Sequence, residues 1–292
     1  MKKLLFILLC LPLLTLAQQT YVPDDNFEQK LINLGYDNIL DDSVTTASID
    51  TITFLLLMGG SIADLTGIED FTALTELDCN NNQLTSLDVS NNTSLIDLKC
   101  SSNQLTSLDI SNNTALGYLN CEENQLIILD ISNNTNLVRL FCHYNQLTGI
   151  DLSNNTALIY LRCDNNQIIS LDVSGVSSLY GLACSNNQLI SLDLRNGNNI
   201  NMNPACADNP NLYCIDVDNE TWATDNWNNI GHHIDTHHYF NNNCSITGIE
   251  EHTTNKELLK VTDILGRETK EINQLLFYIY DDGTVEKRIT IE

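Results

Sequence analysis

The fold is decided by the stretch from Leu74 to Leu194, which carries one pattern six times at a constant spacing. Its first copy, residues 74–94, reads LTELDCNNNQLTSLDVSNNTS. In every copy a leucine lies shortly before a cysteine, and an Asn-Gln pair follows soon after that cysteine. The cysteines are Cys79, Cys100, Cys121, Cys142, Cys163 and Cys184. Such regular copies indicate an array of stacked structural units.

Each unit predicts one short strand followed by a sharp turn. Side chains alternate along a strand, so Leu77 and Cys79 share one face while Glu76 and Asp78 share the other. One unit cannot bury its apolar side alone, whereas stacked copies bury it continuously. The amide of Asn82, and of its equivalents, is expected to satisfy backbone groups that the turn leaves unpaired.

The unit L-x-x-L-x-C-x-x-N-Q-L-x-x-L-D-V-S-N-N-T-x resembles the leucine-rich repeat in its period and in the order of its apolar positions. The resemblance implies a horseshoe-shaped solenoid with a parallel β-sheet on its concave face. Because so short a unit leaves little room for a helix, we expect an extended or 3₁₀ return side. With a degenerate first copy from Ile52 and a worn last copy through Cys206, residues 51–217 hold about eight units, each of about 21–22 residues.

The segments on either side of the repeats are expected to cap them. Residues 18–50 predict a small helical N-terminal cap, because Asp24 can begin a helix that Gly35 ends. Residues 218–245 have no repeat and supply aromatic side chains, so we interpret them as the C-terminal cap. This cap is similar to the N-P-N-L-x-C…C caps of bacterial leucine-rich-repeat proteins. Both caps would cover the open apolar ends of the stack.

Residues 1–17 have the features of a secretory signal peptide. Lys2 and Lys3 precede an apolar run, and small residues lead to cleavage after Ala17; the run is too short to span a membrane. The whole chain carries 13 Lys and Arg against 38 Asp and Glu, a formal charge of −25. Such acidity argues against nucleic acids and anionic membranes as partners. We therefore expect an exported protein without a membrane span in the mature chain.

The C-terminal tail, residues 246–292, contains DILGRE at residues 263–268 and YDDGTVEKR at residues 280–288. These elements resemble the C-terminal sorting domain of type IX secretion substrates, although the strands that an Asn-Pro usually introduces are missing. The resemblance implies a β-rich tail that the secretion machinery recognises. It also implies release from the cell or attachment to the outer cell surface. From the residues alone, alternating strands around an Asp282-Gly283 hairpin turn are expected.

Cysteine, histidine and aspartate patterns could each indicate a metal site or a disulfide. The six repeat cysteines form a line instead of converging on a point, so they are interpreted as small buried apolar residues. Cys214 and Cys244 lie outside that line, and a disulfide between them is expected in an oxidising compartment. His233 and His237 are weak metal-ligand candidates at helical spacing. The repeated Asp88 position could bind calcium, but it also opens a turn in which Asp bonds its own backbone. No cofactor is expected.

The concave strand positions vary while the framework is constant. In the third to fifth copies they carry a set of side chains typical of binding hot spots, which we name the concave patch. Its members are Tyr118, Arg139, Phe141, His143, Tyr160 and Arg162.

These features predict a surface protein that binds or adheres to an extracellular protein or glycan through its concave face. A purely structural surface role is the alternative, and a hydrolase is a third. No Ser-His-Asp, H-E-x-x-H or phosphate-loop pattern supports an enzyme.

Overall fold

The structure is a computed structural model that describes residues 17–227, 234–244, 258–262, 275–280 and 285–289. The chain forms two compact units, one ending at Cys244 and the other beginning at Ser245, and each is described by itself. The predicted signal peptide lies outside the described residues except for Ala17. In the part of the chain that the structure describes, no helix has both the length and the apolar character needed to cross a membrane.

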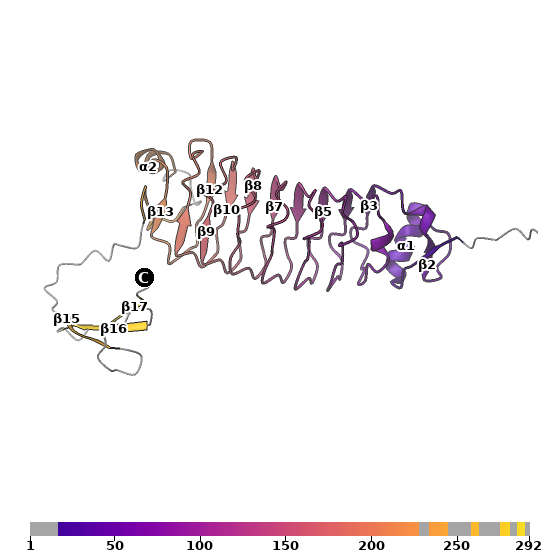
Figure 1. Cartoon of the computed structure of the whole chain (residues 1–292), viewed down its shortest axis with the longest axis horizontal. Coiled ribbons are helices and arrows are strands. Elements are labelled where there is room, and N and C mark those ends of the chain that lie inside the picture. Colours follow the sequence, from indigo (N-terminus) through magenta and orange to yellow (C-terminus); the bar gives the residue numbers. More distant parts are fainter. Residues whose placement is uncertain (1–16, 228–233, 245–257, 263–274, 281–284, 290–292) are drawn as a thin grey trace, which may run out of the picture. The chain divides into compact units, whose positions relative to one another are not determined.

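The first unit is a solenoid whose turns follow one another along a single axis, as Figure 1 shows. One strand from each turn joins a parallel eight-stranded sheet, and each strand pairs in register with that of the next turn. In chain order these strands are β3 (Phe54–Leu56), β4 (Glu76–Asp78), β5 (Asp97–Lys99), β6 (Tyr118–Asn120), β7 (Arg139–Phe141), β8 (Tyr160–Arg162), β10 (Gly181–Ala183) and β12 (Asn203–Ala205). The predicted leucine-rich-repeat solenoid with a parallel sheet is confirmed.

The core is a set of rows, each contributed by one position of the repeat. The central leucine of a strand, such as Leu98 or Leu119, points into the core and is fully buried. The six repeat cysteines are fully buried as well. Burying one leucine stabilises the fold by roughly 1.5–3 kcal/mol, so the sum over many rows holds the stack together.

The turn after each strand is held by a buried asparagine, as the sequence predicts. The Oδ1 atom of Asn103 accepts a hydrogen bond from the backbone N–H of Leu84 at 3.0 Å. Its Nδ2 atom donates to the carbonyl oxygens of Cys79 and Cys100 at 3.0 and 3.1 Å. The residue before each such asparagine has positive φ, between 52° and 58° in the six clean copies. One amide thus joins two consecutive turns and supports a left-handed backbone position.

A second row of buried asparagines lies on the return side. The Nδ2 atom of Asn113 donates to the carbonyl oxygens of Val89 and Asn92, both at 2.9 Å. Four residues of this row are fully buried, and their Oδ1 atoms have no hydrogen-bond partner: Asn92, Asn113, Asn134 and Asn155. The second asparagine of each Asn-Asn-Thr sequence is therefore a cross-link between turns.

The return side is extended, as expected, and forms a multi-stranded sheet only toward the C-terminal end of the described solenoid. That four-stranded parallel sheet consists of β9 (Ser170–Asp172), β11 (Ser191–Asp193), β13 (Cys214–Asp216) and β14 (Tyr239–Asn241). Between the last two strands the chain forms the helix α2 (Glu220–Trp227), in which Trp227 is buried against Phe240 with ring centroids 5.6 Å apart. Cys214 and Cys244 are joined by a disulfide with their Cα atoms 5.7 Å apart.

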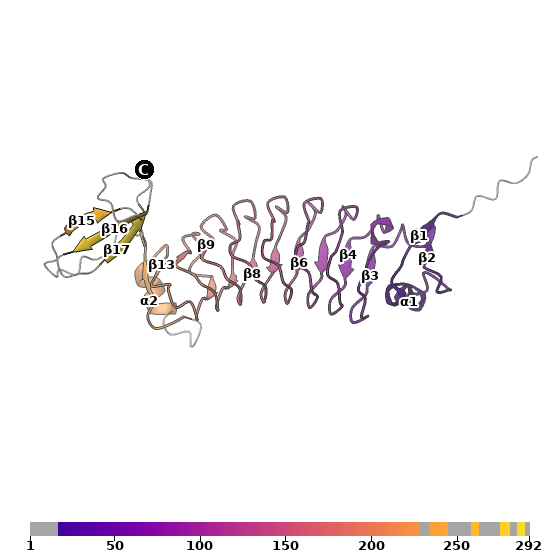
Figure 2. The ribbon, with the colours of Figure 1, turned by 90° about the horizontal axis from the view of Figure 1, so that it is seen from below.

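The N-terminal end of the solenoid is covered by the helix α1 (Asp25–Leu34) and by an antiparallel pair, β1 (Gln19–Tyr21) with β2 (Ser43–Thr45). Asp24 caps the helix by accepting hydrogen bonds from the backbone of Asn26 and Phe27 at 2.9 and 3.0 Å. Two 3₁₀ segments follow, η1 (Thr46–Ser48) and η2 (Ile68–Asp70). Seen from below in Figure 2, α1 and α2 lie at opposite ends of the row of turns. The predicted small helical N-terminal cap is confirmed.

The second unit contains a three-stranded antiparallel sheet of β15 (Leu258–Thr262), β16 (Leu275–Tyr280) and β17 (Val285–Ile289). Ile279 pairs with Val285, so β16 and β17 form a hairpin. The tail is β-rich, as predicted, while the expected turn at Asp282-Gly283 lies outside the described residues.

Candidate functional site

Sheet register brings the concave patch together. Tyr118, Arg139 and Tyr160 pair directly across β6, β7 and β8. Phe141 and Arg162 form the next row on the same face, opposite each other in the same register. Strands about 4.8 Å apart place three consecutive side chains of a row within roughly 10 Å, so the patch is one continuous surface.

The rings of Tyr118 and Phe141 contact each other across the two rows. Their centroids lie 5.5 Å apart and their planes meet at 81°, an edge-to-face arrangement. The ammonium group of Lys99 lies over the other side of the Tyr118 ring, 5.7 Å from its centroid. Partial burial raises the pKa of the Tyr118 hydroxyl, and the negative charge of Asp97 adds to the effect. The pair is therefore preorganised and half-buried, with part of each ring facing solvent.

Tyr160 is the most exposed aromatic member of the patch, with 37% of its surface accessible. The guanidinium carbon of Arg139 lies 5.8 Å from the centroid of this ring. On the other side, the Tyr180 ring meets it edge to face at 5.9 Å. Gly181 leaves the space in which the ring lies, since a Cβ atom there would come within 2.7 Å of Cδ1 of Tyr160.

Arg139 and Arg162 differ in how their charge is used. The Nε atom of Arg162 lies 3.4 Å from a carboxylate oxygen of Asp164. Among the described residues, Arg139 has no carboxylate oxygen within 4.0 Å. A guanidinium beside an aromatic face and without a carboxylate partner keeps its charge available for an incoming anion.

His143 differs from the expectation that all members of the patch are exposed. Only 5% of it is accessible, and its Nε2 atom lies 2.6 Å from a carboxylate oxygen of Glu122. Burial lowers the pKa of the His143 imidazole, and the neighbouring Glu122 charge partly opposes that shift. The side chain lies below the surface and contacts the exposed Tyr144 ring at a centroid distance of 5.6 Å. His143 thus supports the patch and offers little surface of its own.

The repeated aspartates form the turns that the sequence favours. In each of them an Oδ1 atom accepts a hydrogen bond from the backbone N–H two residues later, for example from Ser111 to Asp109 at 2.9 Å. These hydrogen bonds lower the pKa of Asp88, Asp109, Asp130 and Asp151. Each carboxylate oxygen used in this way is committed to its own turn.

Only one of the two weak metal candidates lies in the part of the chain that the structure describes. His237 lies in the C-terminal cap, while His233 lies outside the described residues. The structure instead places His237 close to Asp235 and His238. Neither Asp235 nor His238 was singled out as a ligand from the sequence, since this segment has no repeat from which a register can be inferred.

Comparison with known proteins finds no matching protein-family model. In sequence, 73 residues of the chain are 40% identical to internalin J of Listeria monocytogenes serotype 4b (strain F2365), a match that covers 25% of this chain. The chain spans only 8% of the length of that relative.

Two solved structures from Listeria monocytogenes strain 4b F2365 share the fold. The internalin inlF is 22% identical with a TM-score of 0.57, over 68% of this chain and 69% of that one. Internalin C2 is 24% identical with a TM-score of 0.58, over 71% of this chain and 93% of that one. The chain therefore has the leucine-rich-repeat fold of these two internalins, and a quarter of it is similar in sequence to internalin J.

Proposed function

We propose that the protein is an exported binding or adhesion module that recognises an extracellular protein or glycan through its concave patch. The observation that carries the proposal is the patch itself. Two paired rings, a third exposed ring and the unpaired guanidinium of Arg139 share one face of three neighbouring strands. Aromatic and arginine side chains of this kind dominate the energetics of protein interfaces.

The folded core does not require these side chains. The leucine at the centre of each strand fills the core, whereas the flanking residues of β7 and β8 point away from it. A freely varying exposed surface rarely gathers aromatic residues, because solvated aromatic area carries no folding benefit. The concentration of aromatic side chains in three neighbouring units supports the view that they are kept there to contact a partner.

The chemistry of the patch favours a partner with anionic character. Flat rings offer apolar area to a peptide or a sugar, and Arg139 offers a donor fork for a carboxylate. The flanking strands β4 and β5 carry Glu76, Asp78 and Asp97, which repel anions. An anionic partner would therefore be guided to the third to fifth of the six clean repeats.

A binding role is better supported than a catalytic one. In the described part of the chain, no serine or cysteine side chain donates a hydrogen bond to His143 or His238. The buried thiols also have raised pKa values, because burial disfavours the thiolate. Neither a serine hydroxyl activated by these histidines nor a reactive cysteine thiolate is therefore present among these groups.

Export to the cell surface is the second part of the proposal. A signal peptide at residues 1–17 would take the chain across the inner membrane. The tail, residues 246–292, would then act as a type IX sorting domain, after which the protein is released or attached to the outer surface. Support comes from the DILGRE and YDDGTVEKR sequences and from the three-stranded antiparallel sheet, to which part of the second sequence contributes.

The binding proposal is tested by presenting chain 18–292 to a glycan array and to a panel of purified cell-surface proteins. Arg139→Glu is the comparison variant, because it reverses the available charge at an exposed position. Loss of the captured partner with Arg139→Glu, under an unchanged circular dichroism spectrum, supports the proposal. Equal capture by both proteins would place the binding surface away from Arg139, and no partner of either class would favour the purely structural role.

A further inference from the structure

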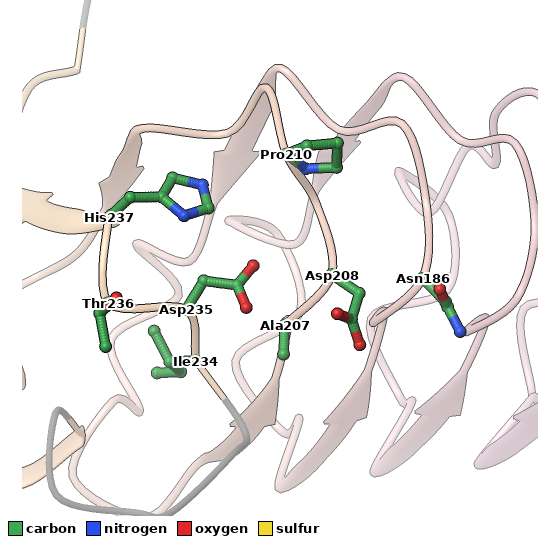
Figure 3. A pocket seen from close by; sticks show the side chains of 8 residues that line it. All are labelled: Asn186, Ala207, Asp208, Pro210, Ile234, Asp235, Thr236 and His237. Atoms are coloured by element: carbon green, nitrogen blue, oxygen red, sulfur yellow. The ribbon is translucent and has the colours of Figure 1, made fainter.

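The C-terminal cap carries a second cluster of side chains that the concave patch does not use. Asp235, His237 and His238 lie in the segment that leads into β14, beside a pocket of about 740 Å³. Figure 3 shows Asp235 and His237 on one wall of this pocket and Asp208 on the wall formed by the last repeat. The cluster therefore lies in the cap, at a pocket that residues of the last repeat also line.

His238 is the unusual member of the cluster. Only 7% of the residue is accessible and its side chain is completely buried, yet neither ring nitrogen makes a hydrogen bond of normal geometry. Its polar neighbours include the Asp235 carboxylate, 3.6 Å from Nε2, and the backbone of Asn209. Burying an imidazole with no hydrogen bond of normal geometry costs free energy, and a ligand at one ring nitrogen would reduce that cost.

The distances suit a small metal ion. Ligand atoms about 2.0–2.1 Å from a tetrahedral zinc ion are roughly 3.4 Å from one another. The pair formed by His238 Nε2 and Asp235 Oδ2 is already at 3.6 Å. One ligand atom from each of the three residues lies within 4.8 Å of the other two. Bringing all three ligand atoms to the spacing of a zinc site requires a shift of roughly 1.5 Å, which the exposed His237 ring can make by rotating about its side-chain bonds.

We propose that Asp235, His237 and His238 bind a divalent transition metal of the zinc class. Two imidazoles and one carboxylate are the ligands that zinc prefers, whereas calcium and magnesium prefer oxygen ligands alone. Three protein ligands leave a fourth coordination position for water or a group in the pocket.

The metal would also fasten the cap to the last repeat. Asp235 already accepts a hydrogen bond from the backbone N–H of Asn209 at 3.4 Å. On the other side, β14 pairs with β13, which carries the disulfide-bonded Cys214. A metal held at Asp235 and His238 would tie the segment before β14 more firmly, so its binding is coupled to stability.

The site differs from the pairing that the sequence suggested, which joined His233 with His237. This difference supplies a matched control, because His233→Ala removes a histidine that is close in sequence and leaves all three proposed ligands in place. Asp235→Asn keeps the shape of the side chain and removes its charge. His237→Ala changes an exposed residue. Asp235→Asn and His237→Ala are therefore both expected to fold.

The test uses chain 18–292 without a histidine tag, stripped with EDTA and titrated with zinc chloride in a calorimeter. The expected result is one zinc ion per chain, with at least tenfold weaker binding for Asp235→Asn and for His237→Ala. His233→Ala should bind like the unchanged protein. Saturating zinc should also raise the unfolding temperature of the unchanged protein by several degrees, an effect that both ligand variants lose. No binding, binding lost with His233→Ala, or equal binding by Asp235→Asn would each overturn the proposal.

Discussion

Replacing Asn134 tests whether the second asparagine row holds the solenoid together. Its Nδ2 atom donates to the carbonyl oxygens of Ile110 and Asn113 at 3.0 and 2.9 Å, and the residue is fully buried. Each carbonyl also accepts a backbone hydrogen bond, from Asn113 and from Leu116 respectively. Neither oxygen is therefore left without a partner when the amide is removed.

The expected magnitude follows from these contacts. Asn134→Ala removes two hydrogen bonds worth about 1 kcal/mol each, so the free energy of unfolding should fall by about 2 kcal/mol. Asn134→Asp is expected to cost more, about 3–5 kcal/mol at neutral pH, because it replaces the donor by a buried charge facing two carbonyl oxygens.

Urea denaturation followed by circular dichroism measures both losses, and the preceding residue supplies a control. Asn133 is exposed and donates one hydrogen bond of 3.3 Å to the carbonyl of Ser111. Asn133→Ala should change the free energy of unfolding by less than about 0.5 kcal/mol. If Asn134→Asp proved as stable as Asn134→Ala, the amide would not be the donor that this reasoning requires.

Three further predictions concern the thiols, one strained turn and the tail. Burial raises the pKa of the repeat thiols, that of Cys121 to about 12. None of the six should therefore react with iodoacetamide at mildly alkaline pH until denaturant is added. Rapid labelling of the native protein, detected by mass spectrometry, would refute the stacking. Tyr144 has φ of 52°, a left-handed backbone conformation that asparagine adopts more easily than tyrosine, so Tyr144→Asn should raise the free energy of unfolding by about 0.5–1 kcal/mol in urea titration. A lower free energy of unfolding would mean that the contact between Tyr144 and His143 outweighs the backbone strain. Deleting Thr247–Glu292 should leave the protein in the periplasm of its native host, as fractionation would show, whereas arrival at the cell surface would refute the sorting role.

Much of the fold follows from the repeat alone. A constant repeat spacing with alternating apolar positions predicts one strand per turn, and sheet register then places Tyr118, Arg139 and Tyr160 side by side. The turn asparagines were also predictable, because the residue that follows a strand in every copy faces unpaired backbone groups. Periodicity carries this information, since each copy constrains all the others.

Other features depend on surroundings that the unit does not encode. The tripeptide Ser-Leu-Asp forms β9 and β11, yet residues 86–88, with the same tripeptide, form no strand, so neighbouring turns decide the pairing. Alternation places His143 on the exposed face, but its contact with Glu122 lies below the surface. The cluster around Asp235 lies in an aperiodic segment, where only the path of the chain brings the ligands together.

The central claim is that the concave patch binds the partner, and its most direct test is the affinity of Phe141→Ala/Tyr160→Ala for the partner identified by array or capture. Neither side chain enters the core, so the double variant should fold normally. If each ring contributes about 1–3 kcal/mol, Kd should rise by roughly thirtyfold or more. Tyr21→Ala, which changes an exposed ring in the N-terminal cap, should leave Kd unaltered. A double variant that folds normally and binds with unchanged Kd would contradict the account and move the binding surface away from the concave face.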